Sequence, residues 1–144
     1  MDIKILEILL QVPILIFYII IFLIPYIFYK NLNYNTLNSF IKITFTFSSS
    51  LIISFLITIF IAYYSNELYK NIILDFYGYN FEGMSDYEYY QNVNKENLTD
   101  LKRIRESQMG IGWPLKAFFT FVVISLPVNL VSNIIFYLKF SKNL

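Results

Sequence analysis

The sequence contains no cysteine and no histidine among its 144 residues. Without them the chain cannot form disulfides, thiolate or imidazole metal sites, or a haem with a histidine ligand. It also lacks the imidazole that most often serves as a general base and the thiol that serves as a nucleophile. We therefore expect a protein that is not an enzyme, with no catalytic, metal-binding or cofactor-binding residues; a structural lipid is the one bound molecule that we leave open.

Charge is also scarce. Only 15% of the residues are charged and the net charge is +1, whereas about 25% are charged in ordinary soluble proteins. Nucleic-acid-binding domains carry a basic patch or stripe, and no such excess is present here. We therefore expect no nucleic-acid partner.

Alanine, arginine, glycine and proline are rare, with 2, 2, 4 and 4 residues, whereas the chain has 24 isoleucines, 13 asparagines, 15 phenylalanines and 13 tyrosines. Physics alone does not exclude alanine from membrane helices, because small residues are favoured at their contacts. The rare residues have GC-rich codons and the abundant ones AT-rich codons. This bias indicates an AT-rich genome, either mitochondrial, bacterial or of a phage.

Hydrophobic residues make up 57% of the chain and gather in three runs, at about 8–29, 43–64 and 113–137. Each run reaches the roughly 20 apolar residues that span a bilayer. Aromatic and lysine side chains near the ends of the runs are typical of anchors at the membrane interface; they are Tyr29, Tyr64, Trp113, Lys116 and Tyr137. The sequence thus predicts an all-α integral membrane protein with three transmembrane helices, forming a single membrane domain over residues 1–144. A soluble core of this size could not bury three such helices on all sides.

A segment of about 48 residues, 65–112, joins the second and third spans. Leu68, Ile72, Ile73 and Phe76 recur at helical spacing and predict that the second helix continues into this loop. Ser85 and Glu88 fit a capping box that begins a short helix, and a further helix is expected within 97–110. Counting lysine and arginine near the membrane places the loop on the cytosolic or matrix side, by a narrow margin.

The third span contains the polar stretch SLPVNLVSN. Pro127 has no backbone N–H to donate, so the helix should bend there. Ser125, Asn129 and Asn133 follow a four-residue spacing, with Ser132 beside them. A matching stripe runs along the second span: Thr46, Ser50, Ser54, Thr58 and Ala62.

We interpret the two stripes as helix-packing surfaces, because small and hydroxyl-bearing residues let membrane helices approach closely and exchange hydrogen bonds. The competing interpretation is a ligand or ion path. Such paths usually place charged residues or histidine inside the membrane, and none lies near the centre of a span. The first span has no small residue, so we expect it to be a peripheral helix that faces lipid or a partner.

These features favour a non-catalytic accessory subunit of a larger membrane complex, such as a respiratory or ATP-synthase complex of an AT-rich mitochondrial genome. The mitochondrial inner membrane is then the expected location, and the bilayer and other membrane subunits are the expected partners. An alternative is a small bacterial or phage inner-membrane protein of the immunity or exclusion type, which binds a toxin or pore. A minor alternative is a homo-oligomeric channel lined by the Ser/Thr stripe.

Overall fold

The computed structural model describes residues 2–31 and 39–141, and these residues confirm an all-helical protein with three long apolar helices and a helical segment between the second and third. Each long helix is sufficiently long and apolar to cross a membrane, which indicates an integral membrane protein. The elements in chain order are α1 (Ile3–Asn31), α2 (Ser39–Tyr63), the π-helix η1 (Tyr64–Leu68), α3 (Tyr69–Phe76), α4 (Asp86–Tyr90), α5 (Leu98–Glu106), α6 (Trp113–Thr120), the π-helix η2 (Phe121–Ser125) and α7 (Leu126–Ser141).

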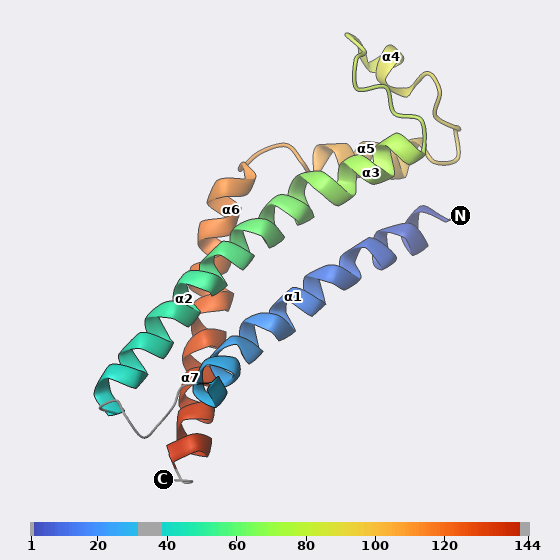
Figure 1. Cartoon of the computed structure of the whole chain (residues 1–144). Coiled ribbons are helices and arrows are strands. Elements are labelled where there is room, and N and C mark those ends of the chain that lie inside the picture. Colours follow the sequence, from blue (N-terminus) through green and yellow to red (C-terminus); the bar gives the residue numbers. More distant parts are fainter. Residues whose placement is uncertain (1, 32–38, 142–144) are drawn as a thin grey trace.

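All three long helices are longer than the hydrocarbon core of a bilayer is thick. The 29 residues of α1 rise about 43 Å at 1.5 Å per residue, whereas the hydrocarbon core is about 30 Å thick. α2, η1 and α3 follow one another without a break and form one still longer helix (Figure 1). The N-terminal turns of α1 lie beside α3 and α5, so the extra length of α1 and of the second long helix lies on the side of the loop (Figure 1).

The first span is less peripheral than the sequence indicated. α1 contacts both α2 and α7, and it buries Ile21, Ile24 and Tyr29. It packs through large rings rather than small residues: Phe22 meets the ring of Phe136 edge-on, with centroids 5.6 Å apart. Aromatic pairs in this geometry are favourable beyond the area they bury. α1 thus packs against both other spans, while much of its surface remains exposed, as expected of a helix that faces lipid or a partner.

The loop has a small hydrophobic core of its own. It joins the start of α1 to η1, α3, α5 and the turn after α3, through Ile3, Tyr64, Tyr69, Ile73, Leu74, Tyr79, Leu101 and Ile104. The predicted helical continuation is present as α3, but its buried face differs from the pattern that predicted it. Leu68, Ile72 and Phe76 are exposed, because α1 and α5 cover the opposite face.

Local sequence explains how the loop turns. Gly78 has a φ of +84°, a conformation that glycine adopts without steric cost, and it follows directly on the end of α3. Ser85 caps α4 by accepting a hydrogen bond from the backbone N–H of Glu88 at 3.4 Å. The Glu88 carboxylate accepts from the N–H of Met84 at 2.7 Å, so the predicted capping box closes one residue earlier than its usual form.

Candidate functional site

The two polar stripes lie opposite one another in the structure. Nine of the ten predicted packing residues are at most 6% exposed, and we call these nine the polar seam: Thr46, Ser50, Ser54, Thr58, Ala62, Ser125, Asn129, Ser132 and Asn133. The tenth, Pro127, is exposed. The seam joins α2 to η2 and α7, so its polar groups face protein rather than lipid.

Asn129 is the centre of the hydrogen bonds in the seam. Its Nδ2 donates to Ser54 Oγ at 2.9 Å, and its Oδ1 accepts from Ser50 Oγ at 3.2 Å. One turn further, Asn133 Nδ2 donates to Ser50 Oγ at 3.1 Å and lies 3.0 Å from Asn129 Oδ1. Two amides on α7 are thus interleaved with two hydroxyls on α2, and each amide bridges the helices.

A hydroxyl pair extends the seam towards the loop. Thr58 Oγ1 lies 2.6 Å from Ser125 Oγ and donates to the carbonyl oxygen of Ser54 at 2.7 Å. A hydroxyl has one proton to donate, so Ser125 is the donor to Thr58. Ser125 therefore crosses to the neighbouring helix rather than bonding back to its own.

The other end of the seam is incompletely paired. Thr46 Oγ1 and Asn133 Oδ1 are buried and have no hydrogen-bond partner among the described residues. Buried polar atoms in native proteins are nearly always paired, and an unpaired one costs free energy. The end of the seam near the start of α2 is therefore its weaker end.

A π-helical turn stands directly before Pro127. In η2 the N–H of Leu126 donates to the carbonyl oxygen of Phe121, five residues back. Pro127 cannot donate, and its ring crowds the carbonyl four residues earlier, so the helix is disturbed at the residue that the sequence singled out. The chain remains helical through the proline in α7; the bend of its axis stays a prediction.

The two π-turns lie at the end of the seam that is nearest the loop. Residues spaced by four drift about 40° around an α-helix at each step, because a turn takes 3.6 residues. A π-turn holds one more residue and reduces this drift. Ala117 before η2 and Ser125 at its end are both buried. In the facing helix, Ala62 and Asn66 are buried at the same spacing, with Asn66 inside η1.

The four-residue spacing reaches beyond the residues that the sequence pointed to. Lys42 is 4% exposed and Asn66 is 2% exposed, and each lies one step outside the predicted stripe. Lys116 Nζ donates to Asn66 Oδ1, and Asn66 Nδ2 donates to Glu67 Oε1 at 2.8 Å. Sequence reasoning missed Lys42 and Asn66 because the stripe was counted only within the uncharged run.

The other predicted interface anchors occupy varied positions. Tyr29 is only 1% exposed, with its ring centroid 6.3 Å from that of Tyr137. The Tyr64 hydroxyl donates to the carbonyl oxygen of Leu10 at 2.8 Å and so ties η1 to α1. Trp113 meets the ring of Tyr63 edge-on at 5.6 Å. Their role at the membrane interface stays a prediction.

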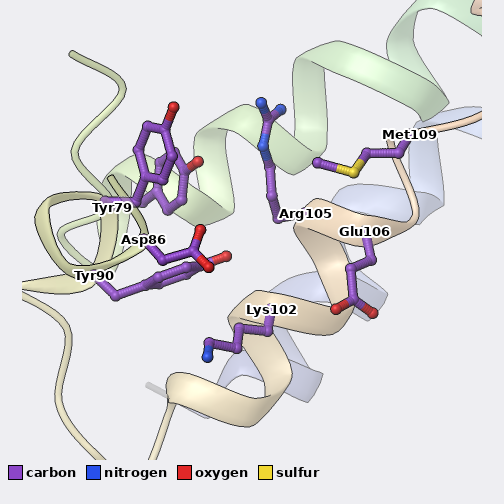
Figure 2. A pocket seen from close by; sticks show the side chains of 8 residues that line it. Tyr79, Asp86, Tyr90, Lys102, Arg105, Glu106 and Met109 are labelled. Carbon is purple, nitrogen blue, oxygen red and sulfur yellow. The ribbon is translucent and has the colours of Figure 1, made fainter. Parts of the chain in front are cut away.

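A second candidate site lies in the loop, where tyrosines face charged residues of α5 across a hollow of about 330 Å³ (Figure 2). We call it the loop groove; it is lined by Tyr79, Asp86, Tyr89, Tyr90, Lys102, Arg105, Glu106 and Met109. Lys102 Nζ lies 5.5 Å from the ring centre of Tyr90, and Arg105 Cζ lies 5.9 Å from that of Tyr79. Sequence reasoning missed this groove, because only the fold brings residues 79–90 against 102–109.

The chemistry of the loop groove suits binding rather than reaction. Burial, followed by the influence of Tyr79 and Asp86, raises the pKa of Tyr90, so its hydroxyl stays protonated at neutral pH and can donate a hydrogen bond. The ring of Tyr79 stacks on that of Tyr89, with centroids 5.6 Å apart. Tyrosine and arginine are enriched in protein–protein interfaces. Within residues 2–31 and 39–141, no group of three or more acidic side chains could hold a metal ion.

Comparison with known proteins gives no relative: no family model, no curated protein and no solved structure matches the chain.

Proposed function

We propose that this chain is a non-catalytic accessory subunit of a larger membrane assembly. The observation that carries the proposal is the use of the polar groups in the spans. Those of the polar seam are buried, and several of them form hydrogen bonds between α2 and α7, so they hold the chain's own helices together. What the chain offers to other molecules is then the apolar outer face of its spans and the loop.

The buried seam disfavours the channel alternative. Ser50, Ser54 and Thr58 are all 0% exposed, so a homo-oligomeric pore lined by this stripe would first have to break the contacts between α2 and α7. A pore also needs a wetted lining, and hydroxyls already bonded across a helix pair cannot supply one.

The tip of the loop is the surface that we assign to a protein partner. Met84 is 93% exposed and Tyr87 is 80% exposed, and both lie next to the loop groove. Large apolar and aromatic side chains exposed together are typical of interaction sites. The bias towards AT-rich codons supports an assembly of the mitochondrial inner membrane, such as a respiratory or ATP-synthase complex.

A second candidate function is a bacterial or phage immunity protein that blocks a toxin or pore. The loop groove favours it, because a compact hollow with stacked tyrosines and with cations beside the rings suits a single dedicated partner. In that case the chain would bind one target, in the membrane or at its surface, and would otherwise remain small.

Native mass separates these functions. We expect the protein extracted from its own membranes in mild detergent to migrate with an assembly many times its 17.2 kDa. A single small species in all conditions would overturn the subunit proposal, and a symmetric homo-oligomer would favour the channel.

A matched pair of variants locates the contact. Tyr87→Ala should release the chain from the assembly without unfolding it, because the side chain is 80% exposed, and Tyr87→Phe should retain most of the association through the ring. Undiminished association of Tyr87→Ala would remove the loop tip from the interface.

A further inference from the structure

A groove lies at the predicted edge of the membrane, where α1 and α6 flank the end of α2. We call it the interface groove; it has a volume of about 360 Å³ and is lined by Ile14, Tyr18, Ile61, Ala62, Ser65, Ile111, Lys116, Phe119 and Thr120. Three separate helical stretches contribute walls, and Ala62 and Ser65 provide small side chains on the side of α2 and η1. The hollow therefore exists because the polar seam has its smallest residue, Ala62, at this position along α2.

The groove runs from the loop into the membrane. Lys116 and Ser65 mark the end near the loop, and Tyr18, Ile61 and Thr120 lie about one helical turn deeper. One turn corresponds to about 5.4 Å, so the groove accommodates the glycerol region and first methylenes of a lipid rather than a whole chain. Phe119 is 54% exposed and Ile111 is 55% exposed, so the groove is open at its side.

The deep part of this groove cannot stay empty without cost. Apolar walls that face a void lose dispersion contacts, and water finds few hydrogen-bond partners against Ile14, Ile61 and Phe119. A methylene chain offers such walls the contacts that they lack. Lipid surrounds the predicted spans at the depth of this groove, so an acyl chain is the available occupant.

The loop end of the groove is positively charged. Lys116 uses one of its three ammonium donors on Asn66, and Lys70 donates to the carbonyl oxygen of Ser107 at 3.2 Å. Lys70 lies one helical turn beyond Asn66, and its ammonium is repelled electrostatically by Lys116 and attracted by Glu67 and Glu7.

The nearby carboxylates are already engaged. Glu67 accepts a hydrogen bond from Asn66, and Glu7 pairs with Arg103 at 3.1 Å. Arg103 also lies 4.0 Å from Asp100, so Glu7 and Asp100 balance Arg103, and Glu67 is left to balance the two lysines. Ammonium donors of Lys70 and Lys116 therefore remain for a further anion. A phosphate between Lys70 and Lys116 would relieve their mutual repulsion.

We propose that the interface groove binds one anionic phospholipid, with its phosphate at Lys116 and Lys70 and the start of one acyl chain between α1 and α6. Such a site would fix the height of the protein in the bilayer and would fill the gap between α1 and α6. It stands independently of the assembly to which the chain belongs.

The test uses the full chain in nanodiscs of mixed phosphatidylglycerol and phosphatidylcholine, with retained lipid counted by native mass spectrometry. We expect one phosphatidylglycerol to stay bound preferentially. Lys116→Gln keeps a donor for Asn66 but removes the charge, and its preference should fall about fivefold, as expected for one lysine near anionic lipid. Lys116→Arg should retain it. Lys139→Gln removes the same charge at the other end of the third span and should change nothing.

A second variant tests the acyl part. Thr120→Phe places a ring in the groove and should reduce retention of both lipids, whereas Val123→Phe adds the same ring at a site that is 68% exposed to lipid and should not. The phosphate site would be overturned if the native chain and Lys116→Gln retained phosphatidylglycerol equally. It would also be overturned if Lys116→Gln lost phosphatidylglycerol and phosphatidylcholine to the same extent. Undiminished retention by Thr120→Phe would remove the lipid from the groove. Thermal unfolding of each variant identifies any that fails to fold, and Lys116→Arg then carries the headgroup test.

Discussion

The hydrogen bond between Ser54 and Asn129 permits a quantitative test of the polar seam. Its length of 2.9 Å joins two side chains on different helices, and both are fully buried. Replacing each residue by alanine, alone and together, isolates the energy of this bond in a double-mutant cycle. Interhelical hydrogen bonds in membrane proteins contribute about 0.6 kcal/mol on average and at most about 1.7 kcal/mol, so we expect a coupling energy in this range.

The two single variants should lower the free energy of unfolding by different amounts, because Ser54 and Asn129 make different numbers of interhelical hydrogen bonds. Ser54→Ala removes one interhelical bond and should cost about 0.6 kcal/mol. Asn129→Ala removes two and should cost about 1–2 kcal/mol, with any cavity adding to the loss. The loss is limited because Ser50 Oγ keeps a second acceptor in the carbonyl oxygen of Phe47 at 3.0 Å, and Asn133 Nδ2 keeps the carbonyl oxygen of Asn129 at 2.9 Å.

The assay is reversible unfolding in bicelles, by detergent titration or steric trapping, with the same probe for all four proteins. Ser48→Ala is the matched control, because Ser48 lies on the same helix but is exposed, and it should leave the free energy of unfolding unchanged. A coupling energy indistinguishable from zero would refute the interpretation of the seam as hydrogen-bonded packing. So would an equal loss in the Ser48 control.

A larger substitution separates close approach from hydrogen bonding. Ser54→Leu replaces a hydroxymethyl group by the larger isobutyl side chain of leucine at a site that is 0% exposed. Overpacking of this kind typically costs about 1–3 kcal/mol, beyond the loss in Ser54→Ala. Unchanged stability of Ser54→Leu would mean that α2 and α7 do not pack closely at this level.

Three further predictions concern single sites. Thr46→Val removes a buried hydroxyl without a partner among the described residues and should leave the free energy of unfolding unchanged or raise it. In Gly78→Ala the new Cβ lies 3.0 Å from the carbonyl oxygen of Asn92 and the residue has a φ of +84°, so the free energy of unfolding should fall by about 1–3 kcal/mol. Gly110→Ala has a φ of +93° but open space around its Cβ, so its free energy of unfolding should fall by less. Burial raises the pKa of Tyr90. The stability linked to its neutral hydroxyl is therefore present below about pH 10 and is lost as the pH rises through the raised value. In an alkaline unfolding titration, Tyr90→Phe should remove the part of the loss in free energy of unfolding that Tyr90 causes.

The fold class was readable from sequence because the bilayer fixes the length of a spanning segment. The continuation of the second helix to Phe76 was also readable, from the helical spacing of Leu68, Ile72, Ile73 and Phe76. The start of the first helix was not: α1 begins at Ile3 rather than near residue 8. This extension depends on the core of the loop, where Ile3 packs with α3 and α5, and that contact joins residues about 70 to 100 positions apart.

The candidate sites divide in the same way. The polar seam was visible as two stripes because a single helix displays its own repeat, and their shared small and polar side chains indicated which helices face each other. The loop groove was not visible, because Tyr79 and Arg105 come together only through the turns after α3 and before α5. The buried face of α3 was likewise decided by neighbours: Ile73 is covered, whereas Leu68, which belongs to the same predicted pattern, is exposed.

The π-turns raise the question of whether proline or the seam produces them. η2 stands directly before Pro127, but η1 forms over Tyr64–Leu68 with no proline beside it. What the two turns share is their place at the loop end of the seam, where buried residues keep a spacing of four or eight positions: Ala62 with Asn66 at η1, and Ala117 with Ser125 at η2. A π-turn reduces the drift that such a spacing accumulates around an α-helix. We infer that the seam holds the wider turns in place and that the proline only lowers their cost.

This inference predicts that Pro127→Ala leaves the register of the seam intact. The chain has no cysteine, so Thr58→Cys and Ser125→Cys introduce a unique pair where the native hydroxyl oxygens lie 2.6 Å apart. The pair should form a disulfide at the same rate with proline or alanine at position 127. If the proline sets the π-turn, its removal lets a regular α-helix form, and the residues before position 125 then rotate relative to those after it. In that case either the disulfide forms more slowly, or a cysteine that replaces Ala117 becomes accessible to labelling from the lipid phase. Either change would assign the turn to Pro127 instead of the seam.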